Sequence, residues 1–296
     1  MKPVIAYLGL GGMGMPMAKR FLDAGYPTTV WNRSPDKAAA LASSGARIAM
    51  SPADAVAGAD FVFTMVADDH ALDDIVLGHQ GLLGAMQPGA MHVSMSTILP
   101  GTSRRLAVAH GERRTTYVAA PVFGRPEAAG AGMLWICLSG ASADQERLIP
   151  LLAHLCRQHY NFGSDPGAAN VLKLAGNFMI ASAIEAMSEA FVFGEKNGLD
   201  QKDLVEFFGS TIFSCPIYQN YGRFIATQNF EPAGFRLALA RKDLQLVAET
   251  ARTSNVPMPF LTTLINRFTA RVAKGGGELD WTSIAIDVAN DAGLEK

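Results

Sequence analysis

The chain has 296 residues, of which 49% are apolar and 18% charged, so it carries ample material for a folded core and no sign of disorder. Lys and Arg number 25 against 27 Asp and Glu, and this balance leaves no basic excess for a nucleic-acid partner. The three cysteines are scattered, without the spacing of a zinc site or a disulfide framework, so no metal is expected.

Six short apolar runs in the first half have the composition of buried strands: VIAYLG, TTVWN, FVFTMV, MHVSMS, YVAAPV and MLWICLSG. Stretches with helical spacing, such as MPMAKRFLDAG and SPDKAAALASSG, lie between them. Apolar strands that alternate with amphipathic helices are typical of a parallel sheet covered on both faces. We therefore predict a doubly wound α/β domain of the Rossmann type over residues 1–162.

Beyond residue 162 the strand-like runs stop, and helical patterns cover 165–196, 200–209, 214–227, 236–254, 258–274 and 280–289. The first of these is apolar almost all the way round, with Val171 and Met179 among its apolar positions. A helix without a polar face is normally buried. We predict an all-helical domain over 163–296, with this helix as its spine and as a contact to another subunit in a homodimer or homotetramer.

The chain opens with a strand pattern, MKPVIAYLGLGG, and not with the charged and apolar regions of a signal peptide. The uncharged apolar runs are shorter than a membrane span; LAGNFMIASAI, for example, lies between Lys173 and Glu185. We expect a soluble, cytoplasmic protein with no membrane partner.

The segment LGLGGMGMPMAKRFLDAGY, residues 8–26, places Gly9, Gly11 and Gly14 in a G-x-G-x-x-G pattern between a strand and a helix. One glycine makes a tight turn, the second lets the backbone approach a pyrophosphate, and the third lets the helix pack on the strand. The phosphates would lie at the helix N-terminus, where free N–H groups favour anions. A tight turn alone is the plainer reading, but the strand and helix on either side favour dinucleotide binding, with Gly12 and Met13 also in the loop.

The end of the next strand run discriminates between the two nicotinamide dinucleotides. An NAD site carries Asp or Glu there for the ribose hydroxyl, whereas this chain has Asn32, Arg33 and Ser34. An arginine holds a 2′-phosphate with its planar fork, and a carboxylate would repel it. An ordinary surface arginine is the alternative, and we predict NADP.

Lys173 is the only charged residue in PGAANVLKLAGNFMIASAI. Burial of an unpaired ammonium is costly, so such a lysine tends either to lose its proton more easily or to face a wet cavity. Asn177 follows four residues later, on the same helix face. Lys173 would donate a proton to a carbonyl oxygen in reduction or accept one in oxidation, and Asn177 would orient that oxygen. A lysine that reaches the surface at the helix start is the alternative.

These motifs together resemble the β-hydroxyacid dehydrogenases, which include 3-hydroxyisobutyrate dehydrogenase and the glyoxylate/succinic semialdehyde reductases. The resemblance covers essentially the whole chain: the glycine segment, MSTILPGTSRRLA, GAANVLKLAGN and RKDLQL. It implies that Thr97 approaches the nicotinamide, that Lys173 and Asn177 are catalytic, and that Lys242 lies beside nicotinamide and substrate. Val66, at the end of the run FVFTMV, joins the expected cofactor contacts.

The expected substrate loop departs from the family. Relatives commonly read Asp-Ala-Pro-Val-Ser-Gly-Gly, whereas residues 119–125 here read AAPVFGR, so Phe123 replaces the serine that helps to hold a carboxylate. Phe123, Gly124 and Arg125 are expected to contact the substrate, with Arg125 as a carboxylate partner or, alternatively, a surface side chain paired with Glu127. In the expected catalytic helix, Ala169 replaces a usual glycine, which is a minor packing change.

We therefore predict an NADP-dependent oxidoreductase that acts on a small aldehyde, ketone or hydroxyacid. An imine reductase of the same architecture is one alternative, although that class usually has Asp or Tyr where Lys173 stands. A non-catalytic dinucleotide-binding module is another. None of the six histidines lies in a motif, so a histidine-based mechanism has no support.

Overall fold

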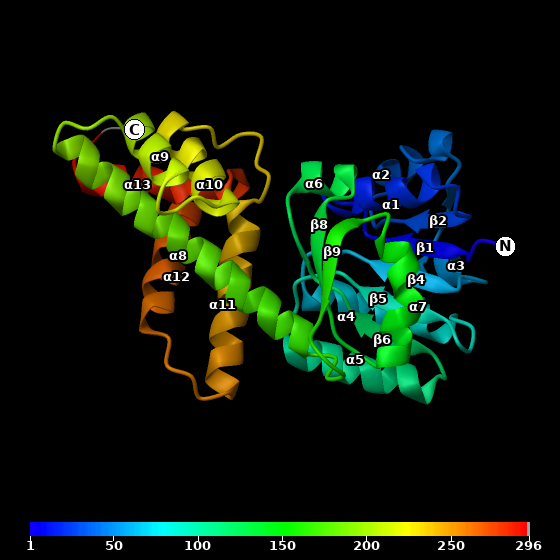
Figure 1. Ribbon diagram of the computed structural model, residues 1–296. Coiled ribbons are helices and arrows are strands. Elements are labelled where there is room, and N and C mark those ends of the chain that lie inside the picture. Colours follow the sequence, from blue (N-terminus) through cyan, green and yellow to red (C-terminus); the bar gives the residue numbers. More distant parts are fainter. Residues whose placement is uncertain (295–296) are drawn as a thin grey trace. The chain divides into compact units, whose positions relative to one another are not determined.

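The computed structural model describes residues 1–294 (Figure 1). They form two compact units, an N-terminal unit over Met1–Lys173 and a helical unit that begins at Leu174. The division falls within one long helix, α8 (Ala168–Lys196). The boundary predicted after residue 162 lies directly beyond the last strand, β9 (Cys156–Asn161).

The N-terminal unit is built on a six-stranded sheet with the order β3-β2-β1-β4-β5-β6, and all of its strand pairs are parallel. Because the first strand is central, the strand order reverses beside it, which is where doubly wound sheets bind ligands at the carboxyl ends of their strands. The predicted Rossmann fold is confirmed. The strands are β1 (Ile5–Leu8), β2 (Thr28–Trp31), β3 (Arg47–Ile48), β4 (Phe61–Thr64), β5 (Met91–Ser94) and β6 (Thr116–Ala119).

Helices cover both faces of this sheet. Successive residues of a strand point to opposite faces, so each strand contributes side chains to the core on both sides. Tyr7 lies in one core cluster with Phe21 of α1 and Leu148 of α7, whereas Leu8 lies in another with Leu72 of α4. Two layers of helix therefore bury both faces, which is why the strands read as continuous apolar runs. The helices are α1 (Gly14–Asp23), α2 (Pro35–Ala39), α3 (Pro52–Val56), α4 (Asp69–Leu77), α5 (Pro100–Glu112), α6 (Pro126–Ala131) and α7 (Ser142–Leu152).

A smaller sheet completes the N-terminal unit, with β7 (Val122–Phe123) antiparallel to β8 (Leu134–Leu138) and β8 parallel to β9. The run YVAAPV, expected as one strand, is divided by Ala120 and Pro121 between β6 and β7. Proline lacks the N–H that a strand ladder needs, so the chain leaves one sheet there and enters the next. The sequence pattern did not reveal β9, because this edge strand is mostly exposed and has polar residues.

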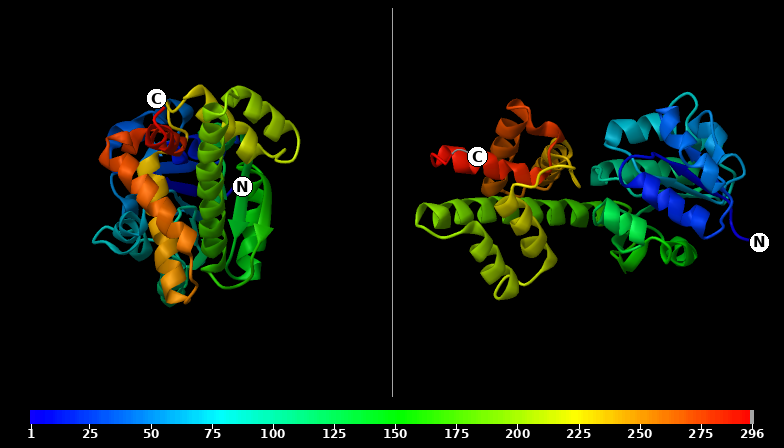
Figure 2. Two further views of the ribbon diagram at one scale, coloured as in Figure 1. Left: turned by 90° about the vertical axis from the view of Figure 1, so that its left-hand side faces the viewer. Right: turned by 90° about the horizontal axis from the view of Figure 1, so that it is seen from above.

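The helical unit contains all six helices that the sequence predicted, with ends shifted by a few residues. Pro216 and Pro259 stand in the first turns of two of them, where a missing N–H costs no bond. Figure 2 shows the shorter helices gathered along α8. They are α9 (Gln201–Ser210), α10 (Pro216–Thr227), α11 (Leu237–Thr253), α12 (Pro259–Ala273) and α13 (Ile284–Asp291).

Helix α8 is buried along one side only. Ile184 and Phe191 belong to the core of the helical unit, but Met179 and Phe193 are 69% and 72% exposed, and Val171 is also exposed. Val171 and Met179 are therefore uncovered in the single chain, because the surrounding helices shield only part of the circumference, and their contact with another subunit stays a prediction. By length and composition alone, α8 also suits a membrane span, a property that it shares with the core helices of globular domains.

Candidate active site

The glycine loop after β1 contains glycines of two kinds. Gly9 has a φ of +95°, and a Cβ there would meet the Met65 carbonyl oxygen; a Cβ on Gly14 would meet the carbonyl oxygen of Gly9. These two glycines are required by the fold itself. A Cβ on Gly11 would instead have no heavy atom within 4 Å, so the protein leaves that side of the loop open. This open approach suits a ligand that must touch the backbone.

The helix that follows the loop is suited to an anion. Met13 precedes α1 without forming a side-chain cap, and the first turn of α1 has no acidic residue. The first N–H groups of a helix have no partner within it, and the helix dipole is positive at this end. The loop and the start of α1 thus fit the pyrophosphate of a dinucleotide.

Asn32, at the end of β2, is bound to the glycine loop. Its Oδ1 accepts a 2.9 Å hydrogen bond from the Leu10 amide, and its Nδ2 donates one of 3.1 Å to the Ser34 carbonyl. Asn32 therefore positions the loop, a role that sequence reasoning did not assign to it. Arg33 and Ser34 follow Asn32 and are exposed, and their contact with a 2′-phosphate stays a prediction.

The ends of β4 and β5 are joined by a residue that the sequence analysis did not single out. Ser96 is fully buried, and its hydroxyl accepts a 2.8 Å hydrogen bond from the Val66 amide. Val66 lies close to the glycine loop, since a Cβ on Gly9 would lie 3.0 Å from its Cγ1. Thr97 follows Ser96 and is half-buried. The Ser-Thr-x-x-Pro pattern was a usable signal for Ser96, although only its threonine had been assigned a role.

The expected substrate loop runs from β7 into α6. Gly124 has a φ of +141°, and a Cβ there would lie 2.6 Å from Leu134 Cδ2, so the fold requires glycine. Arg125 precedes α6, and its Nε lies 4.0 Å from a carboxylate oxygen of Glu127. The anticipated pairing with Glu127 is thus present at the limit of an ion pair, while the Arg125 side chain itself is largely buried.

Lys173 lies against this loop. Its Nζ is 4.1 Å from the centroid of the Phe123 ring, within the range of a cation–π contact. The ammonium is also near the Cys137 thiol: burial raises the pKa of Cys137 to about 11, and the charge of Lys173 opposes that rise. Cys137 is therefore a protonated thiol at neutral pH and packs as a small apolar residue. Lys173 is the charged group beside Phe123.

In the helical unit, Asn177 is joined to the Lys-Asp pair of α11. Its Nδ2 donates a 2.6 Å hydrogen bond to Asp243 Oδ2, and Lys242 Nζ lies 2.8 Å from Asp243 Oδ1. Asn177 and Asp243 are almost fully buried. The expected contact between Lys242 and the nicotinamide stays a prediction, as do the other ligand contacts.

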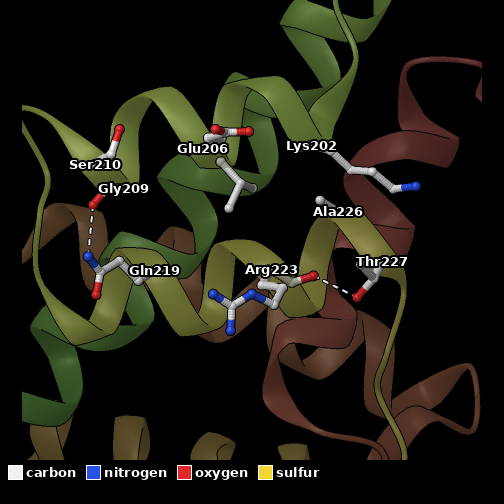
Figure 3. A pocket seen from close by; sticks show the side chains of 9 residues that line it. Lys202, Glu206, Gly209, Ser210, Gln219, Arg223, Ala226 and Thr227 are labelled. Carbon is white, nitrogen blue, oxygen red and sulfur yellow. Dashed lines mark hydrogen bonds between the residues drawn. The ribbon is translucent and has the colours of Figure 1, made fainter.

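The helical unit also contains a pocket of about 410 Å³ between α9 and α10, and no predicted site residue lines it (Figure 3). Gln219 donates a 2.9 Å hydrogen bond to the Gly209 carbonyl at its edge, and Thr227 bonds the carbonyl of Arg223. Its lining residues are Lys202, Val205, Glu206, Gly209, Ser210, Gln219, Arg223, Ala226 and Thr227.

A doubly wound sheet with an open glycine loop and an anion-favouring helix start defines a dinucleotide-binding protein. Two family models agree: the NAD-binding domain of 6-phosphogluconate dehydrogenase matches residues 4–163, and the NAD-binding domain of NADP-dependent 3-hydroxyisobutyrate dehydrogenase matches 167–287. An uncharacterized oxidoreductase, YfjR of Bacillus subtilis, is 40% identical over 280 residues, which are 95% of this chain and 98% of that protein. The chain belongs to the β-hydroxyacid dehydrogenase family.

Solved structures agree with this assignment. The 3-hydroxyisobutyrate dehydrogenase of Mycobacterium tuberculosis, determined with L-serine, has a TM-score of 0.88 at 26% identity and covers 97% of this chain and 99% of its own. An imine reductase from Pseudomonas sp. has a TM-score of 0.64 at 25% identity, with coverage of 96% and 98%. Members of the family use NAD or NADP as the cofactor and act as oxidoreductases on small hydroxyacids.

Proposed function

We propose that the chain is an NADP-dependent oxidoreductase that interconverts a small carbonyl compound and its alcohol, with Lys173 as the general acid and base. The observation that carries this proposal is the position of Lys173, whose ammonium lies 4.1 Å from the ring of Phe123 on the expected substrate loop. Asn177 follows one helical turn later on the same face.

The residues present fit a pyridine dinucleotide. The open side of Gly11 and the start of α1 suit the pyrophosphate, and the exposed Arg33 and Ser34 suit the 2′-phosphate of NADP. When bound, the reduced nicotinamide supplies the hydride to the carbonyl carbon. Lys173 donates a proton to the carbonyl oxygen from its ammonium, and Asn177 holds that oxygen through an amide N–H.

Removal of the Lys173 amine tests the proposal. Lys173→Ala should lower kcat by roughly 10²–10⁴, the usual range for general acid–base catalysis, and leave NADPH affinity nearly intact. Lys196→Ala, at the exposed end of the same helix, is the matched control and should retain full activity. A Lys173→Ala enzyme that keeps more than half of the activity excludes Lys173 as the acid.

An imine reductase activity is the second candidate, because solved imine reductases share this fold at a lower TM-score. A panel of aldehydes, ketones, hydroxyacids and a cyclic imine separates the two. Faster turnover of the imine would favour the alternative, and binding of NADPH without turnover of any compound would favour a non-catalytic module.

We further propose that the substrate has an apolar group beside its carbonyl, since Phe123 stands where relatives have serine. A substrate carboxylate, where there is one, would pair with Arg125, whose fork suits bidentate binding. Benzaldehyde should be preferred over succinic semialdehyde, and Phe123→Ser should shift the preference toward the semialdehyde. A strong native preference for the semialdehyde that Arg125→Ala does not change would contradict this loop assignment.

The proposed assembly is a homodimer or homotetramer in which α8 forms the contact between subunits. The proposed location is the cytoplasm. Val171, Met179 and Phe193 leave an apolar stripe exposed along this helix, and a second copy of the chain is the partner that we propose for it. Light scattering should report at least a dimer at micromolar concentration. Met179→Glu should shift the protein toward the monomer, and a native protein that is already monomeric would refute the proposal.

A further inference from the structure

The small sheet of the N-terminal unit presents aromatic side chains on the face that Lys173 touches. Phe123 on β7 pairs with Trp135 on β8, and Cys137 on β8 pairs with Tyr160 on β9. Residues that pair across neighbouring strands point to the same face, and Trp135 and Cys137 are two positions apart. All four side chains therefore share one face of the sheet.

This face is covered at one end and open at the other. Cys137 is 3% exposed and lies in one core cluster with Ala169, at the start of α8. Trp135 and Tyr160 are 38% and 44% exposed. Lys173 contacts the ring of Phe123, and Phe123 is the strand partner of the half-exposed Trp135.

The open part is held in place by its own contacts. The rings of Trp135 and Tyr160 stack at a centroid distance of 6.3 Å and an interplanar angle of 27°. The guanidinium of Arg157, which lies at a register shift in β9, is 5.3 Å from the centroid of the Trp135 ring. Stacking and cation–π contacts restrict the rotamers of Trp135, so its indole is a fixed surface.

Phe123 and Trp135 are directly paired, so their side chains are neighbours on this face. Phe123 faces the Lys173 ammonium, and Trp135 faces Tyr160 and Arg157. Neighbouring strands are about 4.8 Å apart, so a planar group that reaches Lys173 is within reach of both rings.

We propose that Trp135 is a specificity-determining residue that contacts an aryl group of the substrate while Lys173 donates a proton to the carbonyl oxygen. Phe123, Trp135 and Tyr160 form the surface on which the aryl group lies. The inference rests on the proposed function for the identity of the reacting group and names its substrate class, an aryl aldehyde or ketone. Trp135 itself takes no part in proton transfer.

Steady-state kinetics with benzaldehyde and propanal, both uncharged, test this assignment. Trp135→Ala should raise KM for benzaldehyde roughly fivefold to tenfold, with kcat within a factor of about three, which corresponds to the loss of one aromatic pair. KM for propanal should change by less than about twofold, and Trp135→Phe should restore most of the benzaldehyde affinity. Ile149→Ala, at an exposed position on α7, is the control and should leave KM for both aldehydes unchanged.

A binding measurement separates this inference from the proposed function. Titration of the NADP⁺ complex with 4-nitrobenzamide, an unreactive nitroarene, should quench tryptophan emission, and Trp135→Phe should remove most of the quenching. Trp281, by contrast, is buried. Quenching that depends on Trp135 in an enzyme without carbonyl turnover supports the aryl site and refutes the proposed reaction. Equal KM changes for both aldehydes, or quenching that does not depend on Trp135, would overturn the inference.

Discussion

The Asn177 amide nitrogen lies 2.6 Å from a carboxylate oxygen of Asp243, at an almost fully buried position in the helical unit. An ionised carboxylate can only accept hydrogen bonds, so this contact determines which end of the amide faces Asp243. The second N–H of Asn177 keeps a fixed direction as a result. Asp243 also pairs with Lys242, so one carboxylate orients two of the predicted site residues.

Asp243→Asn should lower kcat by about tenfold while KM changes little, because the new amide can donate as well as accept and no longer dictates the orientation of Asn177. In this prediction, Asp243 acts as a positioning residue. Gln245→Ala, exposed on the same helix, is the control, and the melting temperatures of both variants should be compared with that of the native enzyme. An unchanged kcat in a folded Asp243→Asn enzyme would show that this contact has no catalytic consequence.

The cofactor preference should depend on Arg33. We expect NADPH to be preferred over NADH by at least about tenfold, or 1.4 kcal/mol, and Arg33→Asp should abolish that preference by repelling the 2′-phosphate. The measurement is kcat/KM for both cofactors, with the exposed Arg113→Asp as a control for the change in charge. Equal values for the two cofactors in the native enzyme would refute the assignment.

Two glycines of the loop should respond differently to alanine. Gly11→Ala meets open space, so the free energy of unfolding should change by less than about 0.5–1 kcal/mol, while the affinity for NADPH should fall by about tenfold or more. Gly14→Ala would collide with the Gly9 carbonyl and should destabilise the fold itself. Calorimetric melting and a titration with NADPH distinguish the two effects. Undiminished NADPH affinity in Gly11→Ala would mean that the pyrophosphate does not approach Gly11.

A buried pair of histidines should make the N-terminal unit sensitive to acid. His92 Nδ1 lies 2.9 Å from His110 Nε2. The other ring nitrogen of His92 is hydrogen-bonded to the Thr64 hydroxyl, and that of His110 to the Thr115 hydroxyl. Burial lowers the pKa of His92 well below its ordinary value, with a further contribution from His110, and burial lowers the pKa of His110 to about 4. Both imidazoles are therefore neutral in the folded protein at pH 7.

Because these pKa values are lower in the folded state than in the unfolded state, acid favours unfolding. The stability is fully present above about pH 6.5 and declines as pH falls toward about 4. For His110 alone this loss amounts to roughly 3 kcal/mol, at 1.36 kcal/mol for each pKa unit. Urea unfolding at several pH values should show a shallower decline for His110→Gln, and parallel curves for the two proteins would contradict the prediction.

The amino-acid sequence by itself indicated the alternation of strands and helices, the later run of helices and the nucleotide loop. Periodicity encodes most of the strands and helices, and the glycine spacing of residues 9–14 marks the turn between β1 and α1. The six C-terminal helices were predictable for the same reason, since helices form from contacts between residues close in the chain.

Only the tertiary structure decided how polar side chains from distant segments meet. Nothing in the pattern around Asn177 indicates a bond to Asp243, and nothing around His92 indicates His110, because such contacts depend on how separate elements pack. The short strand β3 and the edge strand β9 were likewise beyond the sequence pattern. Burial is a property of the neighbours that a fold supplies, and an apolar periodicity does not say whether the chain itself or another molecule covers a face.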